Sequence, residues 1–309
     1  MRSIFDLRAF SAPVVLIFGF IGVLYFTSSS SNILQPSNSG VEGRLGEDGV
    51  VRDCRTWEPR DYTPATDNPN IKKAELTDAE KHENRLKSWE NDWKNQIPES
   101  PKSGFGSTIE VTKNMRKSLE TITNQLKKDL GKETIRFLDC PSGDMTWMPL
   151  FLRSRTDVIY SGYDLIPANI DMSKANFSKE PWVFKQFDMM KDRIEDSFDL
   201  VLNRHVSIHL GLLDSIQMFY NMMQSGSKYL ITTTFPDVTV NDPLKYSNQE
   251  VSGRSFHQVN LHLYPFHFPT PICINEDAPA ENQHLALWRI SDLKVFFEEN
   301  KDKFRPFQN

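Results

Sequence analysis

Three aspartates stand where consecutive short apolar segments end, and this placement suits the binding of a small polar ligand. They are Asp139, Asp164 and Asp188. In a sheet of parallel strands, an acidic side chain at the end of the second strand accepts hydrogen bonds from both ribose hydroxyls. Each aspartate alone could cap the helix that follows it. Three in succession favour a site for a nucleoside-containing ligand.

The turn after Asp139 indicates which nucleoside cofactor would fit. Residues 138–144 read LDCPSGD and contain a single glycine, Gly143. NAD sites need G-x-G-x-x-G on this turn, because backbone amides must approach a pyrophosphate. S-adenosylmethionine carries no phosphate, and its ammonium group favours a nearby carboxylate such as Asp139. The turn therefore suits S-adenosylmethionine better than a dinucleotide.

Methyl transfer is an in-line displacement in which positioning dominates, with a base if the nucleophile is a hydroxyl. The base should follow the fourth apolar segment, where residues 203–210 read NRHVSIHL. We name His209 as the candidate general base, with His205 and Arg204 as further catalytic candidates. The [DNS]-P-P-[YFW] motif of amino methyltransferases is absent here, which favours an oxygen nucleophile.

Other roles stay open for these residues. His209 could be structural or could orient the substrate, and Arg204 could form a structural ion pair with Asp188 or Asp199. His205 and His209 could also bind a divalent cation, although no acidic partner at ligand spacing accompanies them. Further ligands would come from a later histidine-rich segment. They are His257, His262 and His267.

The elements that must position these residues alternate along the chain. Apolar runs predict strands at 135–139, 158–164, 183–188, 198–203 and 228–234, with helices near 146–153, 167–176 and 211–223. Two further strand-like runs lie at about 256–263 and 284–290. Five parallel strands and an antiparallel terminal pair predict an α/β fold, a doubly wound, seven-stranded Rossmann-like sheet of the methyltransferase type.

Two helices should precede this sheet. The first spans about 78–95 and carries Trp89 and Trp93 one turn apart, which we interpret as docking it on the core. The second follows a glycine-rich turn at 103–108 (SGFGST), begins at Ser107 or Thr108 as its cap, and ends at Gly131. Its predicted buried face consists of Met115, Leu119, Ile122 and Leu126.

The N-terminal residues predict a membrane anchor. Residues 9–26 are nearly uncharged and would span about 27 Å as a helix. The preceding arginines leave residues 1–8 as a cytosolic tail under the positive-inside rule, and a cleaved signal peptide is the alternative. Residues 27–74 predict a flexible lumenal stem, and residues 75–309 the globular domain. This is the plan of a single-pass type II Golgi membrane protein, secreted if the anchor is cleaved.

Charge and cysteine content exclude several classes of protein. The 36 Lys and Arg residues against 41 Asp and Glu give a net charge of −5, which argues against a nucleic-acid partner. Three scattered cysteines, Cys54, Cys140 and Cys273, exclude a disulfide scaffold. A disulfide between Cys54 and Cys273 stays open.

Together these motifs resemble class I S-adenosylmethionine-dependent methyltransferases, especially a family with a D-x-P-x-G-D-x-x-W-M first motif and membrane-anchored glycan O-methyltransferases. The matching residues are Asp139, Pro141, Gly143, Asp144, Trp147 and Met148. The family's S-G-x-G-S-T, Y-x-G-x-D and S-K-Y-L-x-T-T motifs match 103–108, 160–164 and 227–233. The resemblance covers about 93–293. The family usually has R-D-x-x-x-H-L where this chain has His205, so an Asp–His pair cannot be assumed.

The resemblance implies S-adenosylmethionine as the cofactor, with a divalent cation as an unestablished addition. The residues expected to bind the cofactor are Asp139, Pro141, Ser142, Gly143, Asp144, Trp147, Asp164, Asp188, Ser107 and Thr108. The Phe-, His- and Pro-rich segment 251–271 could form a wall of the acceptor site or only cover the sheet edge. Its candidate substrate contacts are Phe256, His257, Tyr264 and Phe266.

The sequence thus predicts an O-methyltransferase acting on a sugar hydroxyl of a glycan in the secretory pathway. A type II membrane glycosyltransferase is one alternative, disfavoured because the chain has no Asp-x-Asp pair. A catalytically inactive, carbohydrate-binding relative is another.

Overall fold

The computed structural model describes residues 77–94, 101–241, 256–278 and 282–299. The expected cytosolic tail, anchor and stem, together with Cys54, lie outside these residues. Among the helices that are described, none has the length and apolar character needed to cross a membrane.

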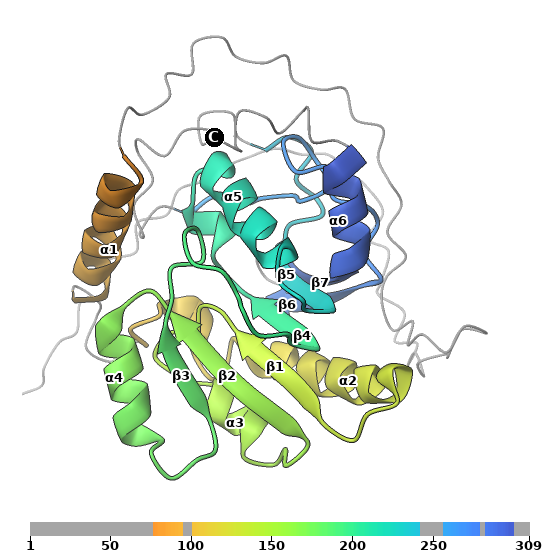
Figure 1. Ribbon diagram of the computed structural model, residues 1–309. Helices are drawn as coiled ribbons and strands as arrows, with labels where there is room; N and C mark the ends of the chain where they lie inside the picture. Colours follow the sequence, from red (N-terminus) through yellow and green to blue (C-terminus); the bar gives the residue numbers. More distant parts are fainter. Residues whose placement is uncertain (1–76, 95–100, 242–255, 279–281, 300–309) are drawn as a thin grey trace, which may run out of the picture. The chain divides into compact units, whose positions relative to one another are not determined.

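A seven-stranded mixed sheet forms the centre of the fold (Figure 1). Its strands are β1 (Ile135–Asp139), β2 (Val158–Asp164), β3 (Val183–Gln186), β4 (Leu200–Asn203), β5 (Tyr229–Thr234), β6 (Cys273–Ala278) and β7 (Gln283–Arg289). They are ordered β3-β2-β1-β4-β5-β7-β6, and β7 is antiparallel to β5 and β6 while the other pairs are parallel. The predicted Rossmann-like methyltransferase sheet is confirmed.

The helices follow the predicted alternation. They are α1 (Asp78–Lys94), α2 (Lys113–Leu130), α3 (Met148–Leu152), α4 (Pro167–Asn176), α5 (Leu212–Met223) and α6 (Ile290–Glu299), with 3-10 turns η1 (Phe105–Ser107) and η2 (Ser207–His209). A capping box starts α1: Thr77 N donates to Glu80 Oε2 (2.8 Å) and Glu80 N to Thr77 Oγ1 (3.3 Å). Gly131, at φ 61°, ends α2 as predicted.

Two hydrophobic clusters lie on opposite faces of the sheet because successive strand residues point to opposite sides. Phe137 and Leu202 join the cluster that includes the buried face of α2, as well as α3. Leu138 and Val201 join the cluster that includes α5 and α6. Both faces are covered, which explains why β4 and β5 are buried along their whole length.

Residues 256–263 do not form the predicted strand. Their alternation buries Val259 and Leu261, but asparagine side chains hold them as an irregular loop: Asn241 Nδ2 donates to Asn260 O (2.9 Å) and Asn260 Nδ2 to Val238 O (2.8 Å). The terminal antiparallel pair is instead formed by β7 and β6, and the β6 sequence CINEDA lacks a strand-like pattern because it carries acidic residues.

The predicted start of α2 is also wrong. The helix begins at Lys113 with Thr112 at its cap position, whereas Ser107 lies in η1. Thr108 forms a separate turn, since its oxygen atoms accept hydrogen bonds from Val111 N (3.4 Å) and Thr112 N (3.1 Å). The glycine-rich segment is therefore a loop before the helix rather than its first turn.

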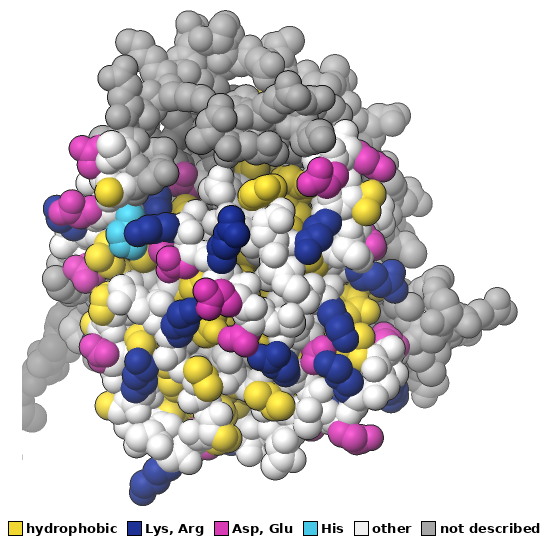
Figure 2. Space-filling model, viewed as in Figure 1, with side chains coloured by type: hydrophobic (Ala, Val, Ile, Leu, Met, Phe, Trp, Pro, Cys, Tyr) yellow, Lys and Arg dark blue, Asp and Glu magenta, His cyan; other side chains and the backbone are white. Residues whose placement is uncertain are grey.

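The surface visible in Figure 2 mixes both signs of charge. Lys and Arg side chains are interspersed with Asp and Glu on this face, and neither sign forms a continuous patch. This face therefore lacks the basic stripe that would attract a nucleic-acid backbone.

Candidate active site

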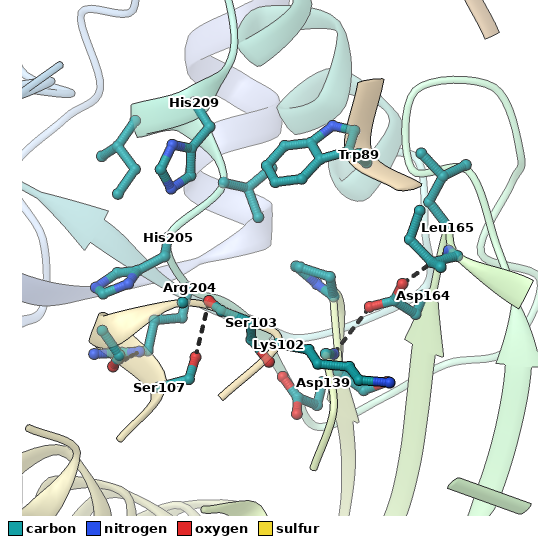
Figure 3. Close-up of a pocket in the computed structure, with 18 of the residues that line it drawn as sticks. Trp89, Lys102, Ser103, Ser107, Asp139, Asp164, Leu165, Arg204, His205 and His209 are labelled. Carbon is teal, nitrogen blue, oxygen red and sulfur yellow. Dashed lines mark hydrogen bonds between the residues drawn. The ribbon is translucent and has the colours of Figure 1, made fainter. Parts of the chain in front are cut away.

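A cavity of about 610 Å³ opens at the carboxyl ends of the central strands (Figure 3). This volume is typical of small-ligand sites. Most of the predicted site residues line it. They are Asp139, Pro141, Ser142, Gly143, Trp147, Asp164, Asp188, Ser107, Arg204, His205, His209 and Phe256.

Five predicted residues do not line the cavity. They are Thr108, Asp144, His257, Tyr264 and Phe266. Phe266 is fully buried and packs against Phe219 and Phe268, so it belongs to the core. Asp144 acts indirectly: its backbone N donates to Ser103 Oγ (3.1 Å), which ties the glycine-rich loop to the turn after β1.

Asp139, the last residue of β1, is a buried carboxyl with an unusual protonation state. Tyr160 Oη donates to its Oδ2 (3.0 Å). Burial raises the pKa of Asp139 to about 8, because an ionised carboxylate is poorly solvated there. At pH 7 this carboxyl is therefore largely protonated when no cationic ligand lies beside it.

Asp164, the last residue of β2, organises the loops around the cavity. Its Oδ2 accepts from Gly143 N (2.9 Å), and its Oδ1 accepts from Ile166 N (2.8 Å) and Asn169 Nδ2 (3.2 Å). Burial raises its pKa above the usual range. Each carboxylate oxygen has two lone pairs, so Oδ2 keeps the capacity to accept from a ligand.

Asp188 follows β3 by two residues and is held by α1, which the sequence did not indicate. His82 Nδ1 lies 2.5 Å and Arg85 Nη2 3.0 Å from its Oδ2. Burial acts to raise its pKa, but the Arg85 charge and these hydrogen bonds outweigh that effect, and the pKa of Asp188 is lowered. One end of α1 is thereby fixed at the cavity.

Arg204 is neutralised by Asp277 of β6, not by Asp188 or Asp199 as considered from the sequence. Its Nε and Nη2 donate to the two Asp277 oxygens (2.8 and 3.1 Å), and Nη1 donates to Gly106 O (2.9 Å). Both side chains are nearly inaccessible. The pair thus joins β6 to the glycine-rich loop.

His205 is a neutral imidazole held by Gln283. The Gln283 Nε2 contacts both Asp277 Oδ2 and His205 Nε2. An amide nitrogen can only donate, so His205 Nε2 is the acceptor. Burial and the Arg204 charge lower the pKa of His205 to about 4. With Nε2 engaged, His205 is better suited to positioning than to accepting a proton from a substrate.

His209 lies in η2 and faces the cavity beside Trp89 of α1. Their rings meet edge-on with centroids 5.7 Å apart. In Figure 3, His209 and Trp89 lie together on one side of the cavity, and Asp139 and Asp164 lie on the other. Sequence reasoning placed Trp89 only as a docking residue, and the side chain of Trp93 lies outside the described part of the chain.

A metal centre finds no support in this arrangement. Within the described residues, no group of three His, Cys, Asp or Glu side chains is close enough to hold an ion. His257, His262 and His267 accordingly do not complete a site with His205 and His209.

Gly106→Ala is expected to destabilise the protein by about 1–3 kcal/mol, the usual effect of overpacking. A Cβ at this position would lie 2.5 Å from His205 Nδ1 and would also clash with Cε1. Chemical unfolding of the full-length chain measures the change. In a His205→Ala background the clashing imidazole is absent, so Gly106→Ala should lower the free energy of unfolding much less. An equal loss in both backgrounds would contradict this packing.

Comparison with known proteins gives partial structural likenesses only. No family model matches the chain, and no curated protein matches its sequence. One similar solved structure is the N-methyltransferase NodS from Bradyrhizobium japonicum WM9 in complex with S-adenosyl-L-homocysteine. Its sequence is 12% identical, the match covers 67% of this chain and 98% of that chain, and the TM-score is 0.46.

Two further likenesses are weaker. A "possible exported protein" from Bordetella parapertussis is 14% identical over 65% of this chain and 78% of that chain (TM-score 0.41). The amino pentose methyltransferase CalS10 from Micromonospora echinaspora, bound to S-adenosylmethionine, is 16% identical over 38% of this chain and 49% of that chain (TM-score 0.32). Likenesses of this size leave substrate and chemistry to be judged from the residues of the site.

Proposed function

We propose that this chain is an S-adenosylmethionine-dependent O-methyltransferase. The observation that carries the proposal is the set of carboxyl groups at the ends of β1 and β2, inside a cavity whose first turn lacks a pyrophosphate cradle. Asp164 would accept hydrogen bonds from the ribose, and Asp139 would pair with the ammonium group. When bound there, the cofactor would supply an electrophilic methyl group.

The residues present fit this cofactor. Asp139 is a buried carboxyl whose ionised form is poorly solvated, and a cation beside it would stabilise that form. The Ser142 hydroxyl is buried at the cavity and has no hydrogen-bond partner in the described structure. A buried polar group without a partner is costly, so a ligand that satisfies both groups would stabilise the site.

Cofactor binding is expected to release close to one proton at pH 7 from Asp139. With a pKa of about 8, this carboxyl is about 90% protonated at pH 7. An ammonium beside it favours the charged form, so the pKa falls and the proton leaves. Calorimetry in buffers of different ionisation enthalpy measures the release. It should be nearly absent in Asp139→Asn, and equal release by both proteins would refute this pairing.

The position of His209, across the cavity from Asp139 and Asp164, supports an acceptor whose nucleophile is an oxygen. His209 lies there, and it would take the proton of an acceptor hydroxyl as the new O–C bond forms. The segment after β4 also lacks the motif of amino methyltransferases. We assign His209 as the general base, with Arg204 and His205 as residues that position the loop and the strand ends.

We further propose that the acceptor is a sugar hydroxyl of a glycan and that the protein works in the Golgi lumen. The apolar segment 9–26 and the polar segment 27–74 support this location. Protease protection of intact microsomes tests it, since a lumenal domain is cleaved only after detergent is added.

Mass spectrometry of glycans tests the activity. Glycans released from cells that express the full-length chain should carry methyl groups, each adding about 14 Da, and cells expressing Asp164→Ala should lack them. Identical glycan profiles in cells with and without the protein would refute a glycan acceptor.

A further inference from the structure

Aromatic rings line the side of the cavity around His209, and one of them comes from α1. Trp89 and Phe256 both contact the imidazole of His209, with ring centroids at 5.7 and 6.5 Å. Phe256 keeps 49% of its surface exposed although it rests on the buried ring of Phe235 (6.0 Å). Accessible aromatic rings in a cavity are typical ligand contacts.

The position of Trp89 is fixed by contacts that α1 makes with Asp188, which also lines the cavity. Arg85 lies one helical turn before Trp89, and His82 lies about two turns before it. Both bind the carboxylate of Asp188. Because residues four apart share a helix face, the contact that holds Arg85 also directs Trp89 toward His209. The helix α1 is thus part of the cavity wall.

The charged groups of the cavity are either distant from His209 or already paired. Asp139 and Asp164 lie on the opposite side (Figure 3). Lys102 lies beside Asp139 and away from His209 (Figure 3), and the next residue, Ser103, is bonded to the turn after β1. Arg204 is neutralised by Asp277. Along the described residues that surround His209, no side chain therefore offers an unpaired charge to a ligand.

From this geometry we infer that Trp89, Phe256 and His209 form the acceptor subsite, and that it selects an uncharged pyranoside. The inference rests on the proposed function and adds the substrate's charge and the contribution of α1. The C–H faces of a neutral sugar ring pack on aromatic rings while its hydroxyls reach the imidazole. A carboxylate or ammonium on the sugar would lose hydration here without gaining a partner.

Saturation-transfer NMR on the full-length chain loaded with S-adenosylhomocysteine tests this subsite. The probes are methyl glycosides of glucose, galactose, mannose and xylose, with methyl glucuronide and methyl glucosaminide as charged counterparts. At least one neutral glycoside should bind at least about fivefold more tightly than the charged ones. Trp89→Ala should weaken its binding about tenfold, while Trp89→Phe retains most of it.

Tyr264→Ala is the matched control, because this half-buried ring lies outside the cavity and its loss should leave glycoside binding unchanged. Binding of no neutral glycoside, equal binding of the charged probes, or an unchanged affinity in Trp89→Ala would each overturn the subsite. Failure of the protein to bind S-adenosylhomocysteine would instead refute the proposed function, so the two failures are distinguishable.

Discussion

Replacing His209 by alanine is expected to lower kcat for methyl transfer by about 10²–10⁴, the usual contribution of a general base. A sugar hydroxyl is a weak nucleophile until its proton is accepted. His209 faces the cavity beside the rings of Trp89 and Phe256, where the sugar is proposed to bind. Affinity for S-adenosylmethionine should change little, because the carboxyl groups assigned to the cofactor lie on the other side. Transfer of labelled methyl under saturating conditions measures the effect.

His205→Ala is the comparison for this prediction. The ring nitrogen of His205 already accepts from Gln283, so its removal should cost less than about tenfold in kcat. A severe loss of kcat in His205→Ala, together with an active His209→Ala variant, would identify His205 as the general base instead. Full activity in both variants would mean that positioning alone accounts for the rate.

Asp277→Asn is expected to destabilise the fold by about 3–5 kcal/mol, because it leaves the buried Arg204 guanidinium without its counter-charge. The Asp277 side chain is 0% exposed and Arg204 is 5% exposed, so water cannot replace the lost partner. Burial acts to raise the pKa of Asp277, but the charge and hydrogen bonds of Arg204, together with the neighbouring His205, outweigh it and hold this pKa well below its usual range. Chemical unfolding of the full-length chain measures the change.

Two further variants separate charge from packing. Asp196→Asn removes the partner of Arg136 in an exposed ion pair, with side chains 59% and 43% accessible, and should change stability by less than about 1 kcal/mol. Replacing both Arg204 and Asp277 by Met and Leu removes both charges and should recover much of the loss. A mild effect of Asp277→Asn, similar to that of Asp196→Asn, would contradict a dry, buried pair.

The sheet and the cofactor side of the site could be read from sequence because their signals are local. Short apolar runs ending in Asp139 and Asp164 identified β1 and β2 with correct bounds, and each aspartate lies at the cavity. A parallel strand buried on both faces has a continuous apolar pattern, and the turn that follows it has its own residue preferences. Neither signal depends on distant parts of the chain.

The missed features depend on contacts between distant segments. Nothing local in CINEDA predicts a strand, because its buried Asp277 is stabilised only by Arg204, 73 residues away. The alternation of apolar and polar residues in 256–263 arises because a loop buries some of its side chains, although it pairs with no strand. Likewise, the bonds of His82 and Arg85 to Asp188 bridge more than 100 residues, so the sequence could not place Trp89 at the cavity.

Binding of S-adenosylmethionine is the central claim, and isothermal titration of the full-length chain tests it most directly. The wild type should bind the cofactor at one site, and Asp164→Ala should weaken binding about 10–100-fold, since hydrogen bonds to a charged acceptor are worth about 1.5–3 kcal/mol. Asp171→Ala, at an exposed position of α4, should leave the affinity unchanged. No binding by the wild type, or unchanged affinity in Asp164→Ala, would contradict the assignment of this cavity.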